Sequence, residues 1–88
     1  MLPASGTFTA DGNSGTLKAA GPVHFHVDGN FGSGQASLEY LAADGSWRTV
    51  ANTAVTADAD KEVRFKNPVK VRVALSGATS PSLYWELR

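Results

Sequence analysis

The sequence contains no cysteine, which excludes disulfide bonds and cysteine-ligated metal sites as sources of stability. Charge of one sign is not in excess, because eight lysines and arginines balance eight aspartates and glutamates. A formal net charge of zero argues against nucleic acid as a partner. No apolar run approaches the roughly 20 residues that span a bilayer, and the start MLPASGTFTA lacks the basic and apolar regions of a signal peptide. We therefore expect no membrane partner either.

Motifs for catalysis and cofactor binding are also lacking. Serines are common, but no nucleophile elbow surrounds them. The glycines between residues 29 and 34 do not match a phosphate-binding fingerprint. Residues 28–39 place Asp, Asn and Glu at positions 1, 3 and 12 of an EF-hand, but Ser33 occupies the position that must be glycine. We predict no enzymatic activity and no cofactor.

His24 and His26 are the only histidines, and they share one face of a predicted strand. Two imidazoles at this spacing can reach one metal ion, but a closed metal site needs further ligands. Symmetry mates around an oligomer axis could supply them. The simpler interpretation is a pair of solvent-facing histidines, and on it we predict no metal site within the chain.

Alternation of apolar and polar residues is the dominant pattern, and it predicts strands rather than helices. Glycine-rich and Asn/Asp-rich segments separate the candidates, including a predicted loop over residues 28–34 and a break at Asn67–Pro68. The candidate strands are residues 5–10, 16–19, 22–29, 36–50 as a hairpin, 62–66, 69–76 and 82–88.

The hairpin and the last strand contain both tryptophans. Asp44–Gly45 predicts a tight turn in which these two residues take the left-handed conformation. Trp47 then follows the apolar face of Leu38 and Tyr40, and Trp85 alternates with apolar neighbours. We predict that both tryptophans belong to the core.

These elements predict an all-β fold: a small antiparallel β-sandwich, or a jelly-roll or immunoglobulin-like barrel, of seven to nine short strands. We expect one domain over residues 1–88, with residues 1–15 as a candidate extended arm. A chain of 88 residues buries only about 60–65% of its unfolded surface, so its core is small. Self-association would supply further burial, and we expect a homo-oligomer, a trimer or a dimer.

Charge is unevenly distributed along the chain. Residues 1–60 hold two basic and six acidic residues, whereas residues 61–88 hold six basic and two acidic residues. Cross-strand pairing of opposite charges within one fold explains this division. The alternative is a two-signed surface that docks onto a charged partner or onto another copy.

The order of elements over residues 21–88 resembles the small all-β virion structural proteins of tailed phages. An alternating strand leads to the hairpin of Asp44, Gly45 and Trp47, and a polar spacer follows. A valine- and arginine-rich strand over residues 71–73 then ends in the turn at Ser76–Gly77, before the aromatic strand over residues 83–87. The same order of strands also suits an immunoglobulin-like or carbohydrate-binding module.

The resemblance implies a virion component that decorates or cements the capsid shell, or a head fibre, assembled in the host cytoplasm. The implied partner is the major capsid protein or another virion protein. The alternative is a ligand- or receptor-binding module of a tail or fibre. We expect contacts through the loop at residues 28–34, the N-terminal segment up to Gly15 and polar strand faces. The candidate contact residues are Asp28, Asn30, Phe31, Arg64, Lys66, Lys70, Arg72 and Tyr84.

Overall fold

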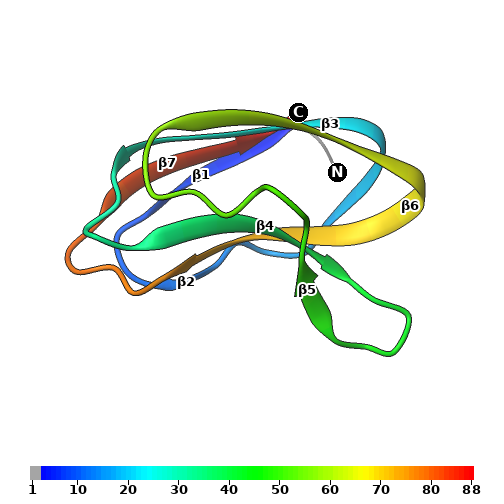
Figure 1. Ribbon diagram of the computed structural model, residues 1–88, viewed down its shortest axis with the longest axis horizontal. Helices are drawn as coiled ribbons and strands as arrows, with labels where there is room; N and C mark the ends of the chain where they lie inside the picture. Colours follow the sequence, from blue (N-terminus) through cyan, green and yellow to red (C-terminus); the bar gives the residue numbers. More distant parts are fainter. Residues whose placement is uncertain (1–2) are drawn as a thin grey trace.

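The computed structural model describes residues 3–88, and every regular element in that range is a strand (Figure 1). The strands are β1 (Ala4–Phe8), β2 (Gly12–Asn13), β3 (Leu17–Asn30), β4 (Gln35–Leu41), β5 (Trp47–Thr49), β6 (Ala59–Ser76) and β7 (Ser82–Leu87). They form one antiparallel sheet in the order β1-β7-β3-β6-β4-β5, with β2 also beside β6. The predicted all-β fold is confirmed. In this part of the chain no helix is long and apolar enough to span a membrane.

Two long strands fold this single sheet into the two layers of a sandwich (Figure 1). The second half of β3 pairs with β7, and the first half of β6 pairs only with β3, so these segments and β1 make one layer. The second half of β6 pairs with β2 and β4 and belongs to the other layer, which β5 completes. Both long strands therefore cross from one layer to the other at the same end of the molecule.

The crossing point is an irregularity in the pairing of β3 with β6. Ala19 pairs with Val69, but Gly21 pairs with Phe65, so a single residue of β3 faces three residues of β6. Such bulges bend strands at the corners of sandwiches, and proline is tolerated there because no ladder hydrogen bond is required. The predicted break at Asn67–Pro68 was wrong, because the chain bends at this point but continues as one strand.

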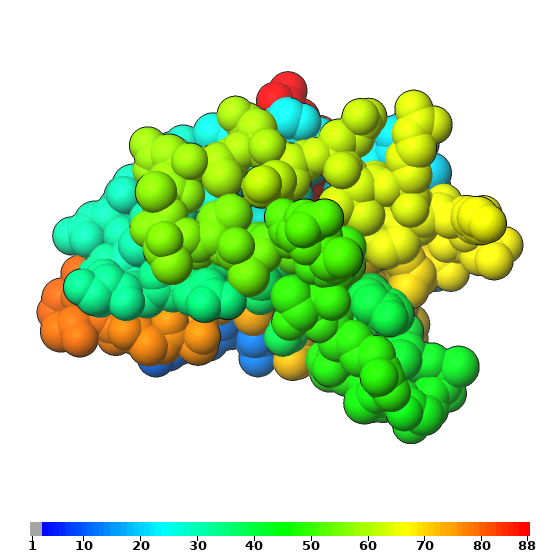
Figure 2. Space-filling model, in the orientation of Figure 1, coloured from blue at the N-terminus to red at the C-terminus, as the bar shows by residue number. Residues whose placement is uncertain are grey.

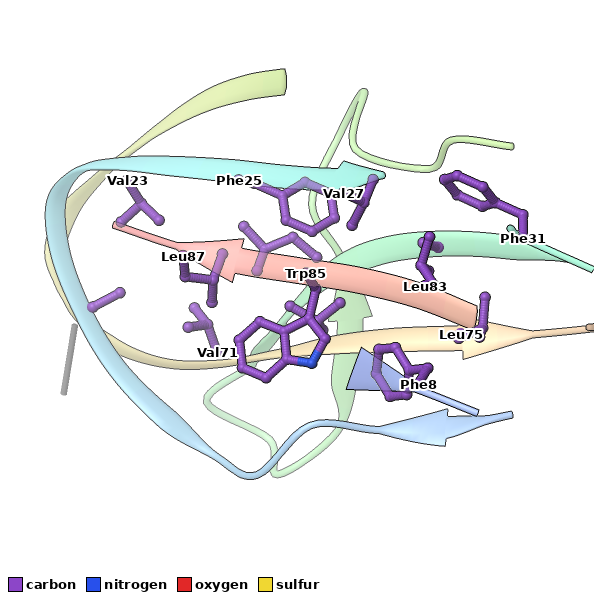
Figure 3. Packing of buried hydrophobic residues seen from close by; sticks show 14 residues of the cluster. Phe8, Val23, Phe25, Val27, Phe31, Val71, Leu75, Leu83, Trp85 and Leu87 are labelled. Atoms are coloured by element: carbon purple, nitrogen blue, oxygen red, sulfur yellow. The ribbon is translucent and has the colours of Figure 1, made fainter. Parts of the chain in front are cut away.

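The core lies between the layers and consists of 14 buried apolar residues (Figure 3). Alternate residues of β3, β6 and β7 supply most of it, as the period-two pattern predicted. Trp85 is 8% exposed, and its indole lies against Gly6 of the neighbouring strand, where no side chain competes for space. The prediction that Trp85 is a core residue is confirmed.

The β4–β5 hairpin differs from the prediction by one residue. Its loop contains Ala43, Asp44 and Gly45, closed by a bond from the Gly45 amide to the Ala42 carbonyl oxygen (3.0 Å). Only Gly45 has a positive φ, of 87°, which is typical of a type I turn followed by a left-handed residue. Trp47 consequently pairs with Leu41 rather than with Ala42. The prediction that Trp47 faces the core was wrong, since this register puts it on the outer face.

Two segments predicted to be loose are parts of the sheet. Within the candidate arm, residues 4–8 pair with β7 along their whole length and residues 12–13 pair with β6, so residues 4–13 do not form an arm. The first two residues of that candidate arm lie outside the described residues. The predicted loop at residues 28–34 is shorter, because its first three residues end β3.

Candidate functional site

The structure places the eight candidate contact residues in different environments. Asp28 and Tyr84 pair across β3 and β7, on the outer face of the first layer. Asn30 ends β3, and its side chain accepts a hydrogen bond from the Gly32 amide (2.9 Å). Phe31 is only 6% exposed and belongs to the core, so it is a packing residue rather than a surface contact (Figure 3). The remaining four, all basic, lie on the outward face of β6 on both sides of its bend.

A compact polar cluster centres on His26 at the outer face of the first layer. The His26 Nδ1 atom lies 2.5 Å from Asp60 Oδ1, and its Nε2 atom lies 2.6 Å from Asp28 Oδ2. The same Asp60 oxygen lies 3.0 Å from His24 Nε2. Asp60 pairs with His26 in the β3–β6 register, which is why residues 34 positions apart in the sequence meet.

This geometry favours a charged His26. An imidazole with a carboxylate at each nitrogen can donate to both only when both nitrogens carry a proton. The hydrogen bonds that His26 donates to Asp28 and Asp60 raise the pKa of His26 above its ordinary value of 6.5. Asp60 accepts hydrogen bonds from His26 and His24, and these bonds, the one from His26 most strongly, lower the pKa of the Asp60 carboxyl group. The cluster therefore joins β3 to β6 by a charge-assisted bridge.

At these histidines the sequence predicted no metal site within the chain, and left open only a metal ion shared with symmetry mates around an oligomer axis. Among residues 3–88, no group of three histidine, aspartate or glutamate side chains is arranged to hold a metal ion.

Tyr84 lies beside the cluster, with its ring centroid 6.2 Å from that of His26. Its hydroxyl donates to Glu86 (2.8 Å), and this bond raises the pKa of Tyr84. The candidate residue Tyr84 is thus held by neighbours on its own layer.

Arg72 occupies the outer face of the second layer and has its partners within the chain. Its Nε atom donates to Glu39 (2.7 Å), and the two residues pair in the β4–β6 register. Its guanidinium carbon lies 4.2 Å from the centroid of the Trp47 ring. Stacking and ion pairing leave Arg72 less available to a partner than its position in the sequence indicated.

The other three candidates on β6, together with Lys18 of β3, surround the bend, and we refer to Lys18, Arg64, Lys66 and Lys70 as the basic end. All four side chains are exposed, and none forms an ion pair within the described chain. Lys18 and Lys70 stand directly opposite each other in the β3–β6 register. Like charges in directly opposed positions destabilise a sheet, so this arrangement is unfavourable for folding alone.

An open groove of about 560 Å³ lies beside the basic end. One wall consists of residues 63–69 of β6, which include the bend. The other wall consists of Tyr40 and residues 49–51, at the end of β5 and just after it. Figure 2 shows this face, with the yellow segment around the β6 bend projecting on the right and the green β5 hairpin below it. Val63, Phe65 and Val69 line the groove, and each is only partly buried against the core. Apolar surface thus remains accessible next to four cations.

Sequence reasoning missed two residues that complete these surfaces. Lys18 joins the basic end only because a bulge sets the pairing of two distant strands, and no local pattern indicates that register. Asp60 bridges both histidines for the same reason. Asp60 lies in the alternating run before residue 66, and extending that strand by two residues would have placed it on the face of Glu62 and Arg64.

Comparison with known proteins identifies no relative, since no protein family, curated protein or solved structure matches this chain.

Proposed function

We propose that this protein is a structural component of a tailed-phage virion that decorates or cements the capsid shell through protein–protein contacts. The resemblance of its strand order to small virion proteins supplies the biological setting. The single structural observation that supports it is the basic end, where four cations without intramolecular partners surround an accessible apolar groove. A binding role, without catalysis, agrees with the open shape of this surface.

The major capsid protein is the proposed partner, and the virion is the proposed location. Exposed cations steer association and set orientation, whereas an apolar surface supplies affinity once water is displaced. On a shell, many identical weak contacts act collectively. We further propose that the free protein forms a homo-oligomer, because an 88-residue chain without disulfides has a small core and leaves apolar residues partly exposed.

The test is co-sedimentation of the purified protein with capsids that lack it. We expect saturable binding that weakens as salt rises, because screening reduces interactions between exposed charges. The variant Lys66→Glu should bind less well than the wild-type protein. The matched control is Arg88→Glu, which makes the same change of charge at a residue that pairs with Glu86.

The outcome that would contradict the proposal is equally specific. Capsids that bring down no protein at low salt, together with binding to purified tails, fibres or a glycan, would favour the receptor-binding alternative. Binding to capsids that is unaffected by Lys66→Glu would leave the virion role but remove the basic end as its docking surface.

A further inference from the structure

The first half of β6 is an open edge of the sheet. Between residues 60 and 70 this strand pairs with β3 on one side, and β4 and β2 join it only from Val71 onward. No other backbone hydrogen bond within the described chain involves this stretch. Alternate amide and carbonyl groups along it therefore point away from the sheet without a protein partner, which is the arrangement that accepts an added strand.

The groove described above lies along this edge. Val63 and Phe65 are partly buried and line the groove, and the exposed Arg64 and Lys66, which alternate with them along the strand, line it as well. A segment laid against the edge would pack every second side chain over the apolar residues. Its other side chains would lie beside the two cations, at the short distances that separate cross-strand neighbours.

We propose that this edge binds an extended, acidic segment of a partner protein as an additional antiparallel or parallel strand. Backbone hydrogen bonds to β6 would hold the segment, apolar side chains would enter the groove, and alternating carboxylates would pair with Arg64 and Lys66. The inference rests on the proposed function only in that the segment belongs to a virion protein; the chemistry of the site stands without it.

The charge of the partner follows from the basic end as a whole. Lys18 and Lys70 lie opposite each other on the neighbouring strands β3 and β6, and neither forms an ion pair with a carboxylate of the described chain. Together with Arg64 and Lys66 they produce a positive field at this end of the molecule. A segment with alternating acidic residues removes that repulsion, whereas a neutral or basic segment does not.

The probe is a pooled set of fluorescent decapeptides that alternate Glu or Asp with Val, Ile or Leu, titrated with the full-length protein. We expect saturable binding by fluorescence anisotropy, and about tenfold weaker binding for Arg64→Glu or Lys66→Glu. Arg88→Glu is the control and should match the wild-type protein. Arg64 and Lys66 are exposed, so these variants should fold, which a thermal melt checks.

Changes to the backbone of the peptide distinguish strand addition from simple charge attraction. Two versions of each bound peptide, N-methylated at odd or at even positions, keep the charges but lose one set of hydrogen-bond donors. We expect one version to lose binding, and hydrogen exchange to slow at residues 61–67 when the unmodified peptide binds. Equal binding of both methylated versions, no protection of these amides, or no binding at all would overturn the inference.

A second copy is the competing occupant, and it has its own signature. Protection of residues 61–67 that increases with protein concentration in the absence of peptide would show that a second copy covers the edge, and would overturn the inference. Failure with peptides would leave binding to capsids intact, and failure with capsids would leave peptide binding intact. The two proposals can therefore fail separately.

Discussion

Trp47 and Leu41 lie directly opposite each other at the end of the β4–β5 hairpin, so both side chains are on the outer face of the sheet. On that face the Trp47 ring stacks with Arg72, which in turn bonds to Glu39. Trp85, in contrast, lies within the core and contacts Gly6 across the β1–β7 pair. The two tryptophans of this chain therefore contribute to stability by different means.

We expect unequal costs when each tryptophan is replaced by alanine. Trp85→Ala creates a cavity in the core and should lower the free energy of unfolding by about 3–5 kcal/mol, which is enough to unfold much of the population. Trp47→Ala removes the cation–π contact with Arg72 and uncovers the surface beneath the ring. It should lower the free energy of unfolding by about 1 kcal/mol. Urea denaturation followed by circular dichroism measures both. Equal losses would contradict the placement of Trp47 on the outer face.

How far the sequence alone could predict this fold is clear from the same hairpin. The alternation of apolar and polar residues correctly predicted strands, their inward faces and the burial of Trp85, because a period of two in apolar residues reflects burial directly. It could not distinguish a two-residue loop at Asp44–Gly45 from the observed three-residue loop. A difference of one residue in the loop exchanges the two faces of the following strand, and so misplaced Trp47.

The candidate site was less predictable than the fold. Arg64, Lys66 and Lys70 were identified from local alternation, which places them on exposed strand positions as observed. Phe31 was misjudged because it lies within a glycine-rich stretch that suggests exposure, yet its ring belongs to the core. The partners of His26 and the proximity of Lys18 to Lys70 depend on the β3–β6 register, which no local pattern specifies.

Gly6 offers a second test of the core. A Cβ atom at this position would lie 2.8 Å from the Trp85 Nε1 atom, and the buried indole has little room to move. We expect Gly6→Ala to lower the free energy of unfolding by about 1–3 kcal/mol, as overpacked substitutions do. Gly15→Ala is the control, since a Cβ there would meet no atom within 4 Å and should be close to neutral. Similar melting of the two variants would contradict the contact between Gly6 and Trp85.

The His26 bridge predicts a defined dependence of stability on pH. A raised pKa in the folded state contributes stability that is complete below the ordinary value of 6.5 and is lost as pH rises through the raised pKa. The lowered pKa of Asp60 acts in the other direction, since its contribution is present above 3.8 and is lost as pH falls through the lowered value. The two contributions together should be greatest between these limits.

Titration of the His26 ring protons by NMR should show a midpoint above 6.5. Asp60→Asn should lower that midpoint and flatten the loss of stability at higher pH, because it removes one of the two carboxylates. Asp58→Asn is the control, since Asp58 accepts a bond from the Gly29 amide and none from His26. A His26 midpoint at or below 6.5, or an equal effect of the two variants, would contradict the bridge.

Self-association is tested on the free protein. We expect analytical ultracentrifugation at micromolar concentration to show a dimer or a trimer, because partly exposed apolar residues remain around the core. The monomer has a mass of 9.2 kDa, so the species are well separated. A single species of that mass over the accessible range of concentration would remove the oligomer from the account and leave assembly on the shell unaffected.

The central claim is that the basic end docks on a capsid shell, and a cryo-EM reconstruction of capsids saturated with the protein tests it most directly. The longest dimension of the molecule is 35 Å, so its orientation can be assigned at subnanometre resolution. We predict regular added density on the outside of the shell, with the β6 bend and Lys18, Arg64, Lys66 and Lys70 against the capsid protein. Density with the bend directed into solvent, density confined to the tail, or bare shells would contradict the claim.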